Sequence, residues 1–303
     1  MTDDEARRAL GQTFDEAAEE YDAARPAYPP ALVDRAIERA GLAAGSPVLE
    51  IGCGTGKLTE MLVQRGLRVD AVDPGPNMLA VARRRVGEAA AVTFHLARFE
   101  DVDLGDRRFE AVFSAAAFHW VDPAISWRKV TDHLEPAGML ALLGYVDVRD
   151  QSSAPIQDGF ANLLATHAPE LMAGWTPFHG LDELLEGAQE RSDNVSHVWD
   201  WLFDGGLNRP SLGEAAAASL FEEVEVAQVA NVVEETVDEW FAVFRTLSLY
   251  HRLDPRQRAA LERDTHHLLE RSGDSVRSPT AVLLITARRA RGEVRRGRRS
   301  YLR

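Results

Sequence analysis

Short apolar stretches alternate with amphipathic stretches through the first half of the chain. At residues 57–65, 77–86 and 124–134 apolar side chains recur at helical spacing, and the last helix is expected to stop before Pro136 and Gly138. Strands that alternate with helices indicate a parallel sheet covered on both faces. The sequence therefore predicts a doubly wound α/β fold, whose first strands are the apolar runs at residues 48–51, 67–72, 92–96, 109–114 and 139–143.

The regular alternation ends after Gly144. Residues 145–222 mix helical patches with Gly, Pro and Trp, and after them we expect a strand at 224–233, helices at 237–249 and 255–269, and a strand at 281–287. Residues 1–24 read as an amphipathic helix. The predicted parts are an N-terminal helical cap (1–45), a nucleotide-binding core (46–144), a lid insertion (145–222), a segment that completes the sheet (223–287) and a disordered basic tail (288–303).

The composition of the chain argues against binding to nucleic acid and against insertion into a membrane. The 303 residues carry a net charge of −14, although residues 288–303 contain eight Arg and one Glu, so the body is strongly acidic and should repel nucleic acid. No apolar run reaches the roughly 18 residues that cross a bilayer, and the polar start lacks the pattern of a secretory signal. The single cysteine, Cys53, excludes an internal disulfide and favours the cytoplasm.

A glycine-rich loop follows the first predicted strand and opens the next helix. It contains Gly52, Gly54 and Gly56, and Asp73 ends the second strand 17 residues later. Glycines let the chain turn sharply against a ligand, and a carboxylate at this place can accept both hydroxyls of a ribose. A dinucleotide fingerprint would need glycine at position 57, where Lys57 stands. The spacing therefore favours a nucleoside ligand over a dinucleotide, and a tight turn without any ligand is the alternative.

The stretch VLEIGCGTGKLTEMLVQRGLRVDAVDPGPNMLAVARRR resembles the cofactor motifs of class I S-adenosylmethionine-dependent methyltransferases. The resemblance covers residues 14–144. Three further segments are similar to the small-molecule branch of this family, the trans-aconitate-methyltransferase-like enzymes: FDEAAEEYDAARPAYP, FSAAAFHWVDP and LEPAGMLAL. The resemblance implies a Rossmann-like, mostly parallel seven-stranded sheet with helical lid insertions, and S-adenosyl-L-methionine as the cofactor.

The same resemblance assigns roles to residues. The three loop glycines approach the methionine part of the cofactor, and Glu50 orders the loop. Asp73 holds the ribose, and Tyr21 and Arg25 close over the carboxylate of the cofactor. Arg98 stands where the family often has an acceptor for the adenine amine, so Glu100 is assigned that contact. The implied cofactor-binding set is Tyr21, Arg25, Glu50, Gly52, Gly54, Gly56, Asp73, Met78, Phe99, Glu100 and Ser114.

The rim after the fourth strand, residues 114–120, should face the methyl acceptor. Methyl transfer needs alignment and exclusion of water, and it needs a base only where the acceptor must lose a proton. His119 is the candidate base, and its alternative is a ring packed against Trp120. Residues 114–118 hold no carboxylate, so we expect no metal. Trp120, Trp175 and Trp199 are assigned to a substrate pocket. The alternative for Trp120 is a residue that only shapes the wall of the site, and the alternative for Trp175 and Trp199 is the core of the lid.

These observations predict a cytoplasmic methyltransferase that acts on a small molecule. By family analogy, the acceptor atom is an oxygen of a carboxylate or hydroxyl group. Two alternatives stay open: a non-methylating cyclase or pericyclase-type enzyme that binds the same cofactor, and a cofactor-binding regulator without turnover. The sequence names neither the substrate nor the oligomeric state.

Overall fold

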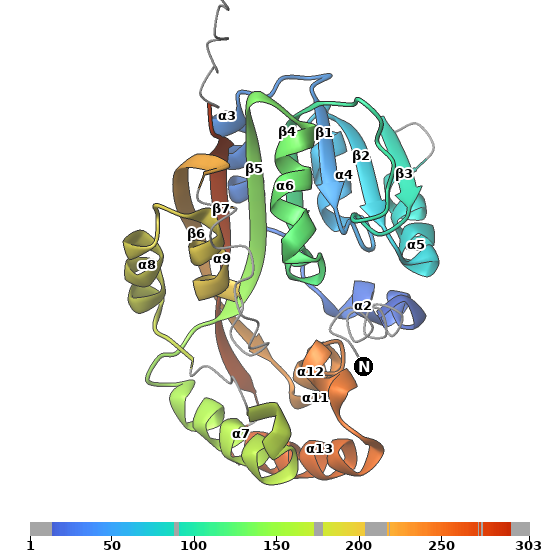
Figure 1. Ribbon diagram of the computed structural model, residues 1–303. Helices are drawn as coiled ribbons and strands as arrows, with labels where there is room; N and C mark the ends of the chain where they lie inside the picture. The colour runs from blue at the N-terminus through green and yellow to red at the C-terminus, as the bar shows by residue number, and fades with distance from the viewer. Residues whose placement is uncertain are drawn as a thin grey trace, which may run out of the picture.

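The computed structural model describes residues 14–87, 91–172, 178–203, 217, 219–271, 273 and 275–291. A seven-stranded sheet in the order β3-β2-β1-β4-β5-β7-β6 runs through its centre (Figure 1). The first five strands in this order are mutually parallel, and β7 is antiparallel to both of its neighbours. The predicted fold class is thereby confirmed. The strands are β1 (Pro47–Ile51), β2 (Arg68–Asp73), β3 (Val92–Leu96), β4 (Phe109–Ala115), β5 (Leu134–Asp147), β6 (Phe221–Glu235) and β7 (Val276–Arg289).

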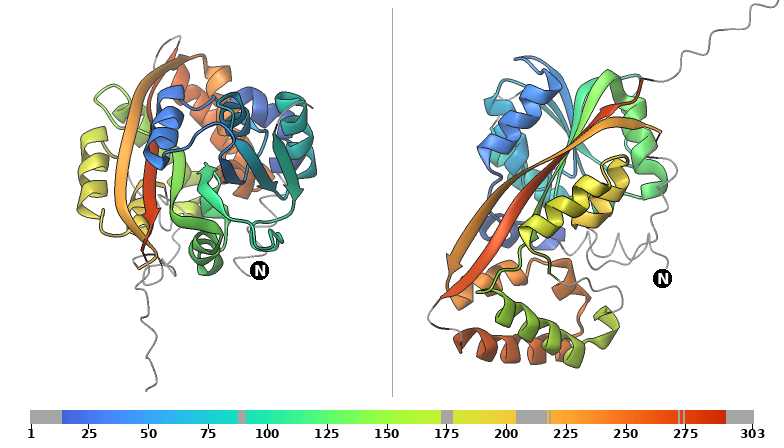
Figure 2. Two further views of the ribbon diagram at one scale, coloured as in Figure 1. Left: turned by 90° about the horizontal axis from the view of Figure 1, so that it is seen from above. Right: turned by 90° about the vertical axis from the view of Figure 1, so that its left-hand side faces the viewer.

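Helices cover both faces of the sheet because its central strands are apolar on both sides. In β1, Leu49 and Ile51 belong to one hydrophobic core and Val48 to the other. This alternation is the period of two expected for a strand. The second core receives α3 (Pro30–Ala40), α4 (Lys57–Gln64) and part of α5 (Pro76–Val86), and the first receives α6 (Pro123–His133), α8 (Leu181–Glu190) and α9 (Val195–Phe203). Figure 2 shows these layers from two sides.

Strand β5 begins earlier than the sequence predicted. It starts at Leu134, directly after α6, and includes Pro136. The ladder between β4 and β5 shifts register near this point, and Ala137 has a φ of 63°. Proline is tolerated in a strand at such an irregularity, because the ladder hydrogen bond is already interrupted there. Leu134 is fully buried, so its side chain favours the strand although the local sequence signals a break.

The segment predicted as a lid lies in two places. Helices α8 and α9 pack on a face of the main sheet, whereas α7 (Ala154–His167) joins a separate hydrophobic cluster at the lower end of the molecule in Figure 1. The predicted helix at 237–249 is two helices, because the chain extends at Leu247. The lower cluster consists of α7, η2 (Pro169–Met172), α11 (Val237–Phe244), α12 (Ser248–Arg252) and α13 (Pro255–Glu270).

The basic tail begins later than residue 288. Strand β7 includes Arg288 and Arg289, whose guanidinium groups donate to the carbonyl oxygens of Ala137 and Leu134. Residue 288, the predicted start of the disordered tail, therefore lies within the last strand of the sheet. Residues 292–303 lie outside the described part of the chain. None of the described helices is long and apolar enough to cross a membrane.

Candidate active site

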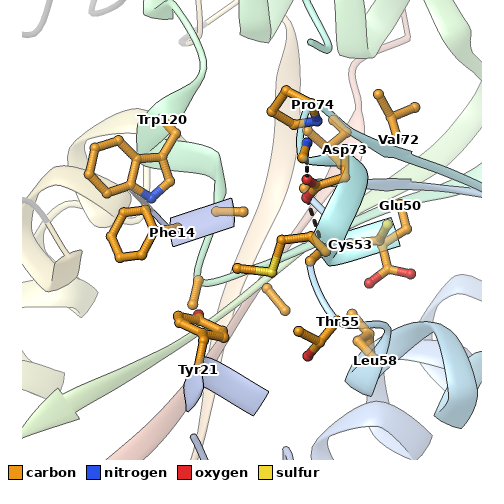
Figure 3. Close-up of a pocket in the computed structure, with 18 of the residues that line it drawn as sticks. Phe14, Tyr21, Glu50, Cys53, Thr55, Leu58, Val72, Asp73, Pro74 and Trp120 are labelled. Carbon is orange, nitrogen blue, oxygen red and sulfur yellow. Dashed lines mark hydrogen bonds between the residues drawn. The ribbon is translucent and has the colours of Figure 1, made fainter. Parts of the chain in front are cut away.

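A cavity of about 930 Å³ opens at the carboxyl ends of β1, β2 and β4. In an open α/β sheet this edge, where the strand order reverses, is the usual place for a ligand. Two further parts of the chain line the cavity: the segment from Phe14 to Tyr28, which includes α2 (Ala18–Ala24), and the start of α12, where Leu247 precedes the helix and Ser248 begins it. Figure 3 shows Phe14, Trp120 and Tyr21 on the side opposite Asp73 and the glycine loop.

The three loop glycines differ in what a side chain would meet. A Cβ on Gly52 would lie 2.3 Å from the Cβ of Ala117, and one on Gly56 would lie 2.9 Å from the Cβ of Ala82. Gly52 thus lets the rim after β4 approach, and Gly56 lets α5 pack against the loop. Gly54 lines the cavity, and no described atom lies within 4 Å of the place a Cβ would take there. A side chain at position 54 would therefore project into the space where a ligand could lie against the loop.

Asp73 joins the glycine loop to the turn that follows β2. Its Oδ2 accepts from the backbone N–H of Gly54 at 2.8 Å, and its Oδ1 accepts from that of Gly75 at 2.8 Å. Burial raises the pKa of this carboxyl to about 6 despite both hydrogen bonds. Each carboxylate oxygen has a second lone pair, so Asp73 can still accept from ligand hydroxyls.

Glu50 is the second buried acid beside the loop. Its Oε2 accepts from the hydroxyl of Thr59 at 2.7 Å, which ties the end of β1 to α4. Burial raises the pKa of Glu50 to about 8, and the nearby carboxyl of Asp73 adds to this shift. The group is therefore largely neutral at pH 7 and fixes the loop as a hydrogen-bonding partner more than as a charge.

Phe99 and Glu100 form one end of the cavity, and Lys129 of α6 holds them. The ammonium group of Lys129 donates to the carbonyl oxygens of Glu100 and Val102 at 3.0 and 2.8 Å, and it lies 5.2 Å from the ring centroid of Phe99. Glu100 accepts from Arg98 at 2.7 Å and from the backbone of Asp122 at 3.0 Å. These contacts fix an apolar ring and a carboxylate side by side at the cavity wall.

Acidic side chains fasten the N-terminal segment over the cavity. Asp15 accepts from the backbone N–H groups of Asn77 and Met78 at 2.8 and 3.0 Å, so it caps the first turn of α5. Asp22 accepts two hydrogen bonds from Arg85 at 2.7 and 2.6 Å, and Lys57 lies 3.3 Å from the same carboxylate. The segment is thus held by the helices that follow the glycine loop and β2.

Arg25 links this segment to the far end of the chain. Its Nε donates to the hydroxyl of Thr246 at 2.9 Å, its Nη2 donates to the Thr246 carbonyl oxygen at 3.3 Å, and the guanidinium lies 5.5 Å from the ring centroid of Tyr21. Both Arg25 and Tyr21 line the cavity. Arg25 makes no ion pair within 4 Å among the described residues, although the buried carboxyl of Asp147 lies near enough for the charge of Arg25 to lower its pKa. Part of the hydrogen-bonding capacity of Arg25 therefore remains for an anionic ligand.

The rim after β4 carries an aromatic group. His119 lies in η1 (Phe118–Trp120), with its ring 4.9 Å from that of Trp120 and 6.3 Å from that of Trp199. His119 and Trp120 line the cavity, whereas Trp199 is 4% exposed and belongs to the core behind them. Ser114 is fully buried, and its hydroxyl donates to the carbonyl oxygen of Ile51 at 2.8 Å, which joins two strands.

The cavity brings together most of the residues singled out in the sequence. Gly56, Ser114 and Trp199 do not line it, and Trp175 lies outside the described residues. Within the described chain, no group of three His, Cys, Asp or Glu is arranged to hold a metal ion. The cavity-lining residues from the predicted set are Tyr21, Arg25, Glu50, Gly52, Gly54, Asp73, Met78, Phe99, Glu100, His119 and Trp120.

Sequence reasoning missed several cavity residues. Tyr145, near the end of β5, lines the cavity, and its hydroxyl donates a hydrogen bond to the carbonyl oxygen of Ala27 at 2.6 Å. The ring of Tyr145 lies 5.5 Å from the ring of Tyr28, measured between centroids. Tyr28 carried a signal, because it lies in the motif with Tyr21 and Arg25. Leu247 and Ser248 carried none, since only the folded chain brings the start of α12 to the cavity.

Comparisons with known proteins agree with this geometry. Residues 49–142 match the family model described as a methyltransferase domain. An uncharacterised methyltransferase from Mycobacterium tuberculosis is 42% identical over 138 residues, which are 46% of this chain and 54% of that protein. Malonyl-[acyl-carrier protein] O-methyltransferase from Serratia marcescens is 36% identical over 114 residues, 38% of this chain and 43% of the relative.

A solved structure extends the likeness in fold. A proposed type II methyltransferase from Anaeromyxobacter dehalogenans superposes with a TM-score of 0.56 at 21% identity, covering 88% of this chain and 97% of the other. The family model identifies residues 49–142 as a methyltransferase domain, and the strand order and the glycine loop agree with the class I resemblance, which is thereby confirmed for this part of the chain. The chain spans about half the length of the curated relatives it matches first, and the trans-aconitate-like subtype stays a prediction.

Proposed function

We propose that this protein transfers a methyl group from S-adenosyl-L-methionine to a small molecule. One observation carries the proposal: Gly54 and Asp73 border one cavity within the methyltransferase domain. A Cβ on Gly54 would meet no described atom within 4 Å, and the Asp73 carboxylate can accept further hydrogen bonds. S-adenosylmethionine, when bound, supplies a methyl group on a sulfonium, which leaves readily once a nucleophile is aligned. The protein's tasks are then to hold, to align and to exclude water.

The lining residues fit the parts of this cofactor. Asp73 has lone pairs for the two ribose hydroxyls, and Gly54 leaves room beside the loop for the amino-acid portion. Arg25 can donate to the carboxylate at the other end. Where the adenine would lie, Met78 and Phe99 are 5% and 3% exposed and offer apolar surface, and Glu100 offers an acceptor for the amine.

We propose an oxygen acceptor, a carboxylate or a hydroxyl. Two malonyl-[acyl-carrier protein] O-methyltransferases among the relatives support this choice. The acceptor would enter beside Phe14 and Trp120, whose rings lie 5.5 Å apart on the side of the cavity away from Asp73. His119, next to this pair, is our candidate to take the proton of a hydroxyl acceptor, and it would only position a carboxylate, which is already ionised at neutral pH.

Calorimetry with S-adenosylmethionine, S-adenosylhomocysteine and NAD tests the cofactor. We expect the first two to bind and NAD not to bind; tight binding of NAD alone would refute the proposal. A metabolite screen with labelled methyl donor then tests turnover through release of S-adenosylhomocysteine. A rearranged, unmethylated product would indicate a cyclase, and cofactor binding without any product would indicate a regulator.

Two glycine variants separate a binding effect from backbone strain. Gly54 and Gly41 both have positive φ (52° and 71°), and a Cβ on either would meet no described atom within 4 Å. Only Gly54 lines the cavity; Gly41 ends α3. We expect Gly54→Ala to lower affinity for S-adenosylhomocysteine at least about tenfold, or about 1.4 kcal/mol, and Gly41→Ala to leave it unchanged. Equal effects of the two variants would contradict the role of the loop.

A further inference from the structure

The helical cluster at the lower end of the molecule reaches the cavity where α11 ends. Helix α11 packs against α2 of the N-terminal segment, and Figure 1 shows the two helices one above the other. Phe244 ends α11 and is buried in the lower cluster, whereas Leu247 and Ser248, at the start of α12, line the cavity. Thr246 lies between them and is buried. This part of the chain lies outside residues 49–142, so the match to a methyltransferase domain assigns it no role.

Both side-chain hydrogen bonds that Arg25 makes within the described chain go to Thr246. The Nε–H group donates to the hydroxyl oxygen at 2.9 Å, and Nη2 donates to the carbonyl oxygen at 3.3 Å. Nε and Nη2 lie along one edge of the planar guanidinium group. Thr246 therefore occupies this edge, and the end of the group stays available, where Nη1 and Nη2 each present a further N–H.

The available end of Arg25 suits a carboxylate, because two parallel N–H groups can donate to its two oxygens. The other neighbours of Arg25 leave this end unused. Tyr21 presents its ring, whose centroid lies 5.5 Å from the guanidinium carbon, and Asp147 makes no ion pair with Arg25 within 4 Å. Since Arg25 lines the cavity, a carboxylate bound there can take up the end-on position.

The hydroxyl of Thr246 is itself fixed. It donates to the carbonyl oxygen of Val243 at 2.6 Å, so its proton is engaged and its lone pairs are left for the Nε–H of Arg25. An arginine held in one conformation before the ligand arrives loses less side-chain entropy on binding. We therefore propose that Thr246 is a positioning residue, which holds Arg25 in place for the carboxylate of the cofactor. This role rests on the proposed binding of S-adenosylmethionine.

Thr246→Val tests this role, because it removes the hydroxyl and keeps the shape of the side chain. The carbonyl oxygen of Val243 keeps a partner in this variant, since the backbone N–H of residue 246 also donates to it at 2.9 Å. In calorimetry the affinity for S-adenosylhomocysteine should fall about three- to tenfold. The affinity for methylthioadenosine, which lacks the amino-acid portion, should not change. Thr246→Ala should give the same pattern, and Thr246→Ser, which keeps the hydroxyl, should bind both ligands as the wild type does.

A double-variant cycle shows whether Thr246 acts through Arg25. In the Arg25→Met background, Thr246→Val should cause no further loss of affinity for S-adenosylhomocysteine, because the group that it positions is absent. Thr265→Val is the matched control. It removes a fully buried hydroxyl from α13 of the same cluster, and that hydroxyl makes no hydrogen bond within the described chain. This control should leave both affinities unchanged.

The outcomes separate this role from the proposed function. A wild-type protein that binds neither nucleoside would refute the proposed function and this role with it. If the wild type binds S-adenosylhomocysteine, three results would overturn the role of Thr246 alone: an unchanged affinity in Thr246→Val, equal losses for both nucleosides, or a loss that adds to that of Arg25→Met.

Discussion

The pKa of Asp73 predicts how cofactor affinity depends on pH. Burial raises this pKa from 3.8 to about 6 in the ligand-free protein. If the ribose hydroxyls bind the carboxylate and not the neutral acid, then the dissociation constant of S-adenosylhomocysteine should be nearly constant above pH 7. Below pH 6 it should rise about tenfold for each pH unit, or about 1.4 kcal/mol.

Stability of the ligand-free protein should change in the opposite direction. Because the folded pKa of Asp73 lies above the usual 3.8, its contribution to stability is present below pH 3.8 and is lost as the pH rises through about 6. Bound ligand favours the ionised carboxylate, so it should lower this pKa. The stabilisation of the protein by S-adenosylhomocysteine should therefore be larger at pH 7 than at pH 5.

Calorimetric titration of S-adenosylhomocysteine from pH 5 to 8 at constant ionic strength measures the effect. Asp73→Asn should bind about 1.5–3 kcal/mol more weakly at pH 7, the range for hydrogen bonds to a charged group, and its affinity should not change over this pH range. Glu50→Gln and His119→Phe are the controls for two further titratable groups that line the cavity, and each variant should keep the wild-type slope. A flat wild-type profile, or a slope that survives in Asp73→Asn, would refute the reasoning.

Four further outcomes are expected. Arg25→Met should weaken S-adenosylhomocysteine by about 1.5–3 kcal/mol and leave methylthioadenosine, which lacks the amino-acid part, unchanged in calorimetry; equal losses would assign Arg25 a purely structural role. Once the labelled-methyl screen has found an acceptor, His119→Ala should lower its turnover at least about 100-fold with cofactor affinity kept, if the acceptor is a hydroxyl; a change below threefold would remove His119 from the mechanism. Methyl transfer should continue in EDTA, and a requirement for Mg²⁺ would contradict this. A truncation after Arg291 should keep its melting temperature and its affinity for S-adenosylhomocysteine, whereas Arg288→Met should melt earlier, because the carbonyl oxygens of Ala137 and Arg39 lose their donor.

The parallel half of the fold was predictable because its signals are local. Strands β1 to β4 are apolar runs flanked by glycine or polar turns, and the structure places them within a residue or two of the predicted positions. The early start of β5 was not predictable. Pro136 and Gly138 signal a break, and only the burial of Leu134 against β4 favours the strand there.

The cavity was predictable where residues share a motif. Asp73 and the glycines lie within one strand–loop–helix–strand unit, so spacing alone indicated that they would meet. The contact between Arg25 and Thr246 joins residues 221 positions apart, and no pattern within either segment predicts it. Similarly, the three glycines look equivalent in the sequence, but their neighbours differ, because those neighbours come from α5 and from the rim after β4.

The chain has only two lysines, and both serve the walls of the same cavity. Lys57 pairs with Asp22 of the N-terminal segment, and Lys129 holds the loop of Phe99 and Glu100. Reductive methylation with carbon-13 would therefore place isotopic probes on opposite sides of the candidate cofactor site, without any mutation. Each of the two dimethyl-lysine resonances would report on one wall, and the dimethylated α-amino group would give a further resonance. Ligand entry at the N-terminal segment and ligand contact at the other end could therefore be followed separately in a single NMR spectrum.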